Sequence, residues 1–194
     1  MIVQNIINTL IFIKRGILVK QGDKKMGDKA VEIIKGDVKE LIELLNKALA
    51  DEWLAVYQYW SGSYVVKGPM RPEIEEELKE HAKEEMEHAD MLANRIIELG
   101  GDPILNPNDL SKMSNCGYEE PSDPTTKEIL KQNIAGEQCA IGVYNTILEK
   151  LKGMNDAITY NMIRKIMQDE VKHEQELQDL QEDLNMMCDC KDKH

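Results

Sequence analysis

Two short runs of the chain each combine a carboxylate with an imidazole: Glu-Met-Glu-His at residues 85–88 and Glu-Val-Lys-His at residues 170–173. Residues three apart lie on one face of an α-helix, so each run points a glutamate and a histidine at the same place. Mixed carboxylate and imidazole ligation suits iron or manganese better than a thiolate-rich zinc site. A single glutamate lies one predicted helix before each run. The complete candidate ligand set is Glu52, Glu85, His88, Glu137, Glu170 and His173.

Capping and breaking residues delimit a first pair of helices. Asp37 with Glu40 forms a capping box, and the helix it opens should run to about residue 66, where a Gly-Pro pair stops it. Pro72 stands near the first position of a second helix, which should run to about residue 99 before two glycines. The short connection between them predicts an antiparallel hairpin.

A second hairpin is predicted in the C-terminal half. Asp123-Pro124 should open a third helix that Gly153 closes, and Asn155 is expected to cap a fourth helix that runs to about residue 187. The two hairpins are joined by a long polar loop at residues 101–123, with a short helix expected at about residues 108–113. This loop is long enough to cross the length of a bundle.

The apolar residues of all four helices recur in steps of three and four, the pattern of bundle packing. In each stripe the candidate ligands interrupt the apolar run near its middle, so helices running up and down would bring them to one level. Burying four ionised glutamates is prohibitive without cations, and two divalent ions would neutralise them. We therefore predict an all-α, antiparallel four-helix bundle with a long crossover loop and a buried dinuclear centre.

Charge and cysteine content limit the functional classes. The 194 residues carry a net charge of −12, which disfavours binding to nucleic acid and favours cations. Four cysteines are too few for a disulfide scaffold of this size, so we expect an intracellular, cytoplasmic protein. No run of 18 apolar residues occurs, so no membrane span is expected.

The bundle should occupy residues 37–187. Residues 1–36 form a predicted N-terminal extension, partly helical or disordered, whose apolar stripe over residues 1–22 is interrupted by Lys14 and Arg15. We interpret that stripe as a frayed extension, with a docking helix as the alternative. Residues 188–194 are expected to form a flexible tail containing two cysteines.

These residues resemble the ferritin-like di-iron carboxylate proteins, for which one glutamate from each of two helices and a Glu-x-x-His from each of the other two is the known ligand arrangement. The run Glu-Glu-Met-Glu-His-Ala-Asp at residues 84–90, followed by Leu-Gly-Gly-Asp-Pro at residues 99–103, looks like bacterioferritin. Tyr59, seven residues after Glu52, matches the tyrosine beside ferritin di-iron sites. Rubrerythrins carry a further glutamate three residues after the third-helix ligand. This chain has Ala140 there, which argues against that branch of the family.

Two cysteines refine the resemblance. Cys139 lies two residues after Glu137, and Cys116 lies in the crossover loop. Dps-like ferritins called thioferritins have a bacterioferritin-type site inside the bundle with such a cysteine pair nearby. The resemblance implies a redox-active disulfide between Cys116 and Cys139, with unpaired thiols as the alternative. It also implies a hollow homo-oligomer, most simply a dodecamer, that oxidises Fe(II) and stores ferric mineral.

Family analogy assigns individual roles. Glu85 and Glu170 would bridge the two metals, with the other two glutamates terminal and one histidine on each metal. Glu84 and Asp169 are candidates to accept hydrogen bonds from the far nitrogens of the histidines. Tyr59, which we include among the catalytic candidates, could donate electrons or quench radicals. Trp53 could do the same or pack in the core.

Two further residues, His81 and Met86, lie close to the ligands in the second predicted helix. His81 lies one turn before Glu85, and we interpret it as a core or channel histidine rather than a third ligand. Met86 stands where bacterioferritins place a haem-binding methionine, on the outward face, but haem is not expected.

The predicted function is ferroxidase activity at two iron ions per subunit, with manganese as an alternative metal and hydrogen peroxide or dioxygen as oxidant. Iron storage in a cage would protect against oxidative stress. One alternative is a di-iron or di-manganese redox enzyme without storage, such as a peroxidase, catalase or hydroxylase. Another is a cage or DNA-protecting protein without enzymatic activity, against which the acidic composition speaks.

Overall fold

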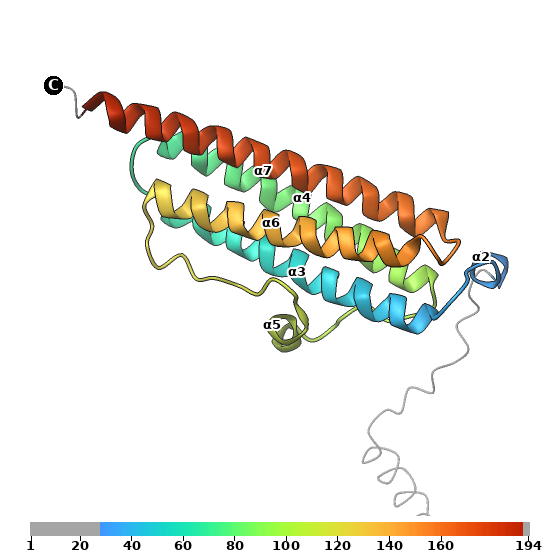
Figure 1. Cartoon of the computed structure of the whole chain (residues 1–194). Coiled ribbons are helices and arrows are strands. Elements are labelled where there is room, and N and C mark those ends of the chain that lie inside the picture. Colours follow the sequence, from blue (N-terminus) through green and yellow to red (C-terminus); the bar gives the residue numbers. More distant parts are fainter. Residues whose placement is uncertain (1–27, 192–194) are drawn as a thin grey trace, which may run out of the picture.

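The computed structural model describes residues 28–191. Four long helices lie along one another as a bundle (Figure 1), and they are α3 (Val38–Val65), α4 (Arg71–Glu98), α6 (Thr126–Leu151) and α7 (Ala157–Lys191). A short helix, α2 (Asp28–Glu32), precedes them. The strongest packing is α3 against α4 and α6 against α7, so the two predicted hairpins and the all-α bundle are confirmed. The predictions for residues 1–22 and for the end of the tail lie outside the described residues.

The crossover loop returns the chain along the whole bundle. The helices α4 and α6 point in the same direction (Figure 1), which requires such a return. The predicted short helix is present as a 3₁₀ turn, η1 (Pro107–Asp109), followed by α5 (Leu110–Met113), which packs on α3. At the far end, the Lys67 N–H donates to Pro124 O at 2.7 Å and the Thr126 N–H donates to Lys67 O at 2.9 Å. These bonds tie the start of α6 to the end of α3.

The observed cap of α3 is the predicted residue, whereas the caps of α6 and α7 differ from the prediction. Asp37 accepts hydrogen bonds from the backbone of the first turn of α3, as predicted. The cap of α6 is Thr125, two residues after the predicted Asp123. At α7 the prediction of Asn155 was wrong: Asp156 accepts from the Thr159 N–H at 3.0 Å. Asn155 has a left-handed backbone (φ 57°), so it forms the turn before the cap instead. Helix α7 also runs on to Lys191, past the predicted end near residue 187.

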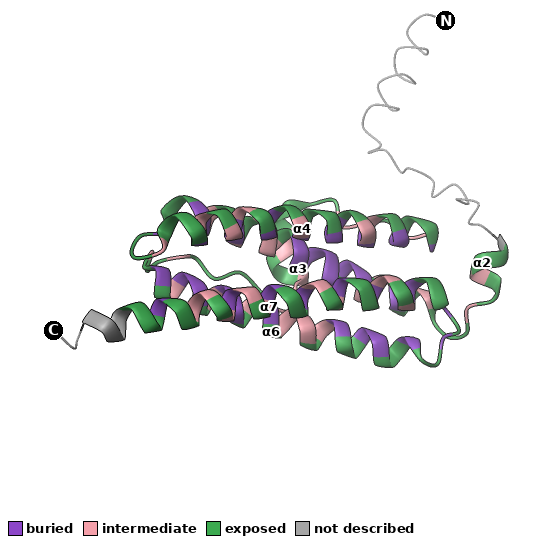
Figure 2. Cartoon of the chain, turned by 90° about the horizontal axis from the view of Figure 1, so that it is seen from above, coloured by how far each residue is buried: buried purple, intermediate pink, exposed green. Residues whose placement is uncertain are grey.

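The core consists of two apolar clusters separated by a polar layer. One cluster lies towards the start of α3 and includes Leu45, Leu92 and Ile163. The other lies towards the end of α3 and includes Leu78, Ile129 and Leu177. Buried residues face the interior of the bundle and exposed residues cover its outside (Figure 2). The candidate ligands occupy the layer between the clusters. No helix within residues 28–191 combines the length and apolarity needed to cross a membrane.

A buried ionic network fixes α4 against the start of α7. The Arg95 guanidinium donates to both carboxylate oxygens of Asp156, at 3.0 and 3.1 Å, and to Thr159 Oγ1 at 2.7 Å. Both Arg95 and Asp156 are almost fully buried. Asp156 therefore serves as helix cap and as counter-ion at once. Removing it would leave a buried guanidinium without its partner.

We predict that Asp156→Ala destabilises the metal-free chain by about 3–5 kcal/mol, because it breaks a buried ion pair and a helix cap together. The matched control is Asp37→Ala, which removes only an exposed cap and should cost about 1 kcal/mol. Urea unfolding followed by circular dichroism, at one fixed chain concentration, measures both. Equal losses for the two variants would contradict the role assigned to Arg95.

Candidate metal centre

The six predicted ligands converge in the middle of the bundle. Each of the four long helices contributes at its midpoint, one residue from α3 and α6 and two from α4 and α7. None is more than 3% exposed, so no ligand faces bulk water. The ligands are Glu52, Glu85, His88, Glu137, Glu170 and His173.

One group of donor atoms surrounds the Nδ1 atom of His88. Glu85 Oε2 lies 2.9 Å away, Glu170 Oε1 lies 3.1 Å away and Glu52 Oε2 lies 3.6 Å away. A single imidazole nitrogen carries at most one proton and cannot hydrogen-bond three carboxylates at once. One cation at the centre of the group could contact all four donor atoms.

A second group surrounds the Nδ1 atom of His173. Glu85 Oε1 lies 3.1 Å away, Glu170 Oε2 lies 3.7 Å away and Glu137 Oε2 lies 3.9 Å away. Glu85 and Glu170 thus present one oxygen to each histidine. This is the arrangement expected of bridging carboxylates, with Glu52 and Glu137 at the outer ends. The assignment of Glu85 and Glu170 as the bridging pair stays a prediction that this geometry supports.

The terminal glutamates are oriented by tyrosines. The hydroxyl of Tyr59 donates to Glu137 Oε1, and the hydroxyl of Tyr144 donates to Glu52 Oε1. The second oxygen of each glutamate faces the centre and has no hydrogen-bond partner among the described residues. A buried carboxylate oxygen without a partner is costly, and a metal ion would satisfy it. The donor set therefore fits a pair of divalent cations.

Tyr144 was not predicted as a functional residue, because it lies in the apolar stripe of its helix. A signal was present: Tyr144 follows Glu137 by seven residues, as Tyr59 follows Glu52. The same offset of 85 residues relates Glu52 to Glu137 and the Glu-x-x-His runs to each other. The two hairpins thus form similar halves, and each tyrosine contacts the terminal glutamate of the other half.

The far nitrogens of the histidines contact the predicted acidic partners. His173 Nε2 lies 2.6 Å from Glu84 Oε2, and His88 Nε2 lies 3.3 Å from Asp169 Oδ2. Both contacts join α4 to α7, so this prediction is confirmed. An acceptor at Nε2 holds the proton there and leaves Nδ1 free to bind a metal.

Burial dominates the electrostatics of the carboxylates. Burial, and after it the charges of Glu170 and Glu85, hold the pKa of Glu52 well above its usual range. The same causes raise the pKa of Glu137. In the absence of a cation, the terminal glutamates therefore tend to retain protons.

The histidines respond in the opposite way to their carboxylate neighbours. Burial alone would lower the pKa of His173, but contacts with Glu170 and Glu85 raise it to about 10. The pKa of His88 is likewise raised, against burial, by Glu170, Glu52 and Glu85. Without metal, the neighbouring carboxylates therefore favour the protonated form of both imidazoles.

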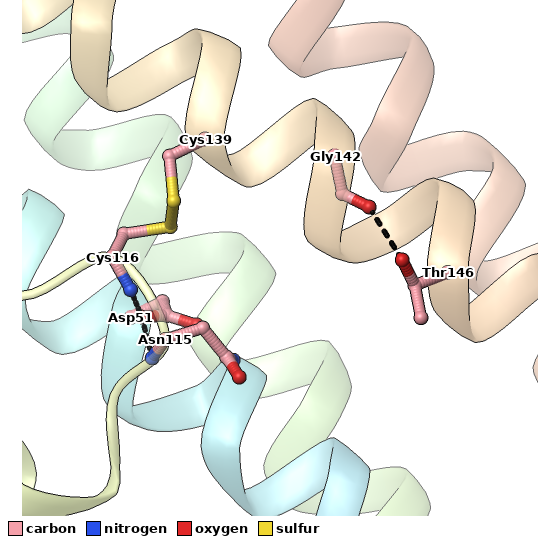
Figure 3. The surroundings of a disulfide bond; sticks show 6 residues. All are labelled: Asp51, Asn115, Cys116, Cys139, Gly142 and Thr146. Carbon is pink, nitrogen blue, oxygen red and sulfur yellow. Dashed lines mark hydrogen bonds between the residues drawn. A yellow bond between two sulfur atoms is a disulfide. The ribbon is translucent and has the colours of Figure 1, made fainter.

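A disulfide borders the centre. Cys116, in the crossover loop, is bonded to Cys139 on α6, with a Cα–Cα distance of 5.8 Å (Figure 3). Asp51 on α3 holds the same loop, because its carboxylate accepts from the backbone N–H groups of Asn115 and Cys116 at 2.7 and 2.8 Å. The pairing implied by the resemblance is thus present, whereas its redox activity stays a prediction.

A cavity of about 240 Å³ lies between this loop and the bundle. Its wall includes both cysteines of the disulfide, and it extends to Tyr59, Glu137 and Glu170. The cavity therefore connects the surroundings of the disulfide with the metal ligands.

Three further predicted residues have clear positions. His81 is 1% exposed, and burial lowers its pKa to about 4. Trp53 is 38% exposed, so the alternative of core packing was wrong for it: it lies next to Glu52 in sequence, but on the outer face of α3. Met86 is also exposed, as predicted for the outward face of α4.

We predict that metal binding releases protons and strengthens as pH rises from 6 to 8. Coordination needs neutral imidazoles, and the pKa of His173, about 10, lies above this range. Calorimetric titration with Zn²⁺, a redox-inert probe, in buffers of different ionisation enthalpy would measure the release. We expect more than one proton per pair of ions. Uptake without proton release would contradict the protonated state assigned to the metal-free centre.

Comparison with known sequences identifies the domain. A family model described as a ferritin-like domain matches residues 42–187. The chain is 33% identical over 139 residues to a DNA protection during starvation protein of Pyrococcus furiosus, covering 71% of this chain and 75% of that protein. It is 31% identical over 140 residues to a bacterioferritin of Rhodobacter capsulatus, covering 72% of this chain and 81% of that protein.

Solved structures agree with this result. The chain is similar to a dodecameric thioferritin, the bacterioferritin-related protein of Bacteroides fragilis, with a TM-score of 0.81 and 41% identity over 84% of this chain and 98% of that one. Dps from Thermosynechococcus elongatus, at 20% identity and a TM-score of 0.70, shares the fold over 73% of this chain and 90% of that one. Since the family model spans most of the chain, and relatives above 30% identity cover more than two thirds of it, the protein belongs to the ferritin-like family.

Proposed function

We propose that this protein is a ferroxidase that oxidises Fe(II) at the dinuclear centre and stores the ferric product. The observation that carries the proposal is the shared use of Glu85 and Glu170, each of which presents one oxygen to His88 and one to His173. Two metal positions that share two carboxylates hold a pair of electron donors close together. The similarity to a thioferritin and to bacterioferritins supports iron as the substrate.

The donor chemistry favours iron, with manganese as the alternative. Four carboxylates and two imidazoles form a hard, mixed oxygen and nitrogen site. Two divalent ions carry the positive charge that balances four ionised glutamates. The tyrosine hydroxyls hold one oxygen of each terminal glutamate, so the other oxygen stays directed at the metal.

Hydrogen peroxide is the proposed oxidant, and dioxygen is the alternative. Two Fe(II) ions each lose one electron, the two electrons break the O–O bond, and two protons complete two molecules of water. A centre that holds two Fe(II) ions supplies the two electrons that this reaction needs. The cavity that reaches Glu137 and Glu170 gives a small oxidant a way to the ligands.

The disulfide is proposed to take part in redox chemistry. Cys116 and Cys139 line the same cavity as Glu137 and Glu170, and electrons would pass between the sulfur atoms and the centre across this cavity. The thioferritin of Bacteroides fragilis is the relative that suggests this assignment.

Storage requires a closed assembly, which we propose to be a dodecamer in the cytoplasm, protecting against oxidative stress. One observation supports self-association: α3 exposes an aromatic stripe composed of Trp53, Tyr57, Trp60 and Tyr64. An exposed apolar stripe of this kind is typical of a surface that another chain covers. The relative from Bacteroides fragilis is described as dodecameric. The net charge of −12 argues against DNA as a partner.

Stopped-flow absorbance tests the ferroxidase proposal. With two Fe(II) per chain under anaerobic conditions, addition of peroxide should oxidise iron at least about tenfold faster than in buffer, a barrier difference of about 1.4 kcal/mol. Glu85→Gln should reduce the rate to that of buffer, because it removes a shared ligand. The control Glu182→Gln alters an exposed carboxylate further along α7 and should match the wild type. A wild-type rate no faster than buffer would disprove the proposal.

Particle mass and iron content together test storage. We expect native mass spectrometry to give about twelve times the chain mass of 22.2 kDa, and aerobic loading to retain far more than two iron ions per chain. A dimer that retains no more than two ions per chain would instead support a redox enzyme without storage. Metal analysis of the protein as isolated would then separate iron from manganese.

A further inference from the structure

A second group of ligand-type side chains lies beside the dinuclear centre. His81 on α4 points its Nε2 atom at two carboxylates, Glu77 Oε1 at 3.2 Å and Glu176 Oε2 at 3.3 Å. The imidazole is 1% exposed, whereas the side chains of Glu77 and Glu176 are 27% and 34% exposed. The group therefore has one buried member and opens to solvent between α4 and α7.

The corresponding position in the other hairpin lacks this group. Shifting by 85 residues, which superposes the dinuclear ligands of the two halves, relates His81 to Ile166. The same shift relates Glu77 to Met162 and Glu176 to Met91. All three counterparts are apolar and belong to one hydrophobic cluster: Met91, Met162 and Ile166. One half of the protein thus places a Glu-His-Glu group where the other half packs apolar side chains.

The geometry of the group suits a bound cation better than hydrogen bonding alone. The Nε2 atom can donate only one hydrogen bond, and this bond goes to Glu176. The Glu77 carboxylate, which lies 3.2 Å from Nε2, therefore receives no hydrogen bond from the ring. Two donor atoms on one ion at about 2.0–2.2 Å lie about 2.8–3.6 Å apart, for bond angles from about 90° to tetrahedral, and both distances fall within this range. Lys172 contacts the other oxygen of Glu176 at 3.1 Å and leaves Oε2 available.

The far nitrogen of His81 differs from those of the dinuclear ligands. Its Nδ1 atom is buried and has no hydrogen-bond partner among the described residues. His88 and His173, by contrast, have an acidic partner at the far nitrogen. Since no acceptor faces Nδ1, the proton of the neutral ring lies on Nε2, between Glu77 and Glu176, and a cation bound there would take its place.

The group is continuous with the dinuclear centre. The ring of His81 stacks on that of His173, with centroids 4.1 Å apart. Donor atoms of His81, Glu84 and His173 also lie within 4.8 Å of one another. Ligand-type side chains therefore lead from the partly exposed Glu77 and Glu176 to the buried centre.

We propose that Glu77, His81 and Glu176 bind one divalent cation, at a third site outside the dinuclear centre. We further propose that this site passes Fe(II) to the centre along His81, Glu84 and His173. The transfer rests on the ferroxidase function proposed above, whereas the binding of a cation does not.

Titration with Co²⁺, whose visible absorption reports coordination, tests the site in the full-length protein. We expect three ions per wild-type chain. His81→Ile introduces the residue found in the other half and should lower the count by one. Glu176→Gln should weaken the same site at least about tenfold, a change of about 1.4 kcal/mol. It serves as the second variant because Glu176 is partly exposed, so its substitution should leave the fold intact. The control Glu182→Gln changes an exposed carboxylate further along α7.

The outcomes separate this proposal from the proposed function. A wild-type chain that binds only two ions would overturn it, as would a count of three that survives His81→Ile. If Glu85→Gln leaves the count unchanged while His81→Ile lowers it, the third site stands and the dinuclear assignment fails. Anomalous scattering from a crystal with stoichiometric Co²⁺ should give a peak between Glu77, His81 and Glu176, and density only at the dinuclear ligands would refute the site.

The transfer is tested by a separate measurement. After mixing with one Co²⁺ per chain, the wild-type spectrum should change from that of the third site to that of the dinuclear centre. In His81→Ile, the dinuclear spectrum should form at least about tenfold more slowly. Equal rates in both proteins would leave a binding site and overturn its role in delivery.

Discussion

The burial of four carboxylates in one layer of the bundle is the constraint on which the structure depends. Ionised glutamates without counter-charges would make this layer strongly unfavourable, and the side chains of the clusters on either side are apolar, while the buried Arg95 is paired with Asp156. Compensation must therefore come from within the layer. Protons on the histidines and terminal glutamates provide it in part, as their raised pKa values indicate. Two divalent cations would compensate the four negative charges fully. The glutamate charges that destabilise the metal-free bundle therefore also give the centre its affinity for metal.

The second organising feature is the similarity of the two hairpins. Each half contributes one glutamate, one Glu-x-x-His, one tyrosine and one acidic partner, all related by the offset of 85 residues. Each tyrosine and each acidic partner acts on the other half, through Tyr59 and Glu84 on one side and Tyr144 and Asp169 on the other. The halves are therefore locked together by the groups that orient the ligands, which couples assembly of the bundle to the geometry of the centre.

Helical periodicity was sufficient to predict the bundle, the long crossover and the meeting of the ligands at one level, because these follow from spacing along single helices. Contacts between helices were harder to predict. Tyr144 was missed because its position in an apolar stripe says nothing about the glutamate it meets on α3. Asp156 was missed as a cap because its choice over Asn155 depends on Arg95, a residue of another helix. Periodicity likewise could not show that Trp53 faces outwards.

Departures from the internal similarity lie on one side of the centre. The disulfide uses Cys139, whose counterpart is Leu54, and His81 has the counterpart Ile166. His81 stacks on His173 and contacts Tyr59 edge-on, while the cavity beside the disulfide is lined by Tyr59 and Glu137. Tyr144, the counterpart of Tyr59, does not line that cavity. The disulfide, the cavity and His81 therefore lie around Tyr59, and we infer that cation and oxidant both approach the centre from the side of this residue.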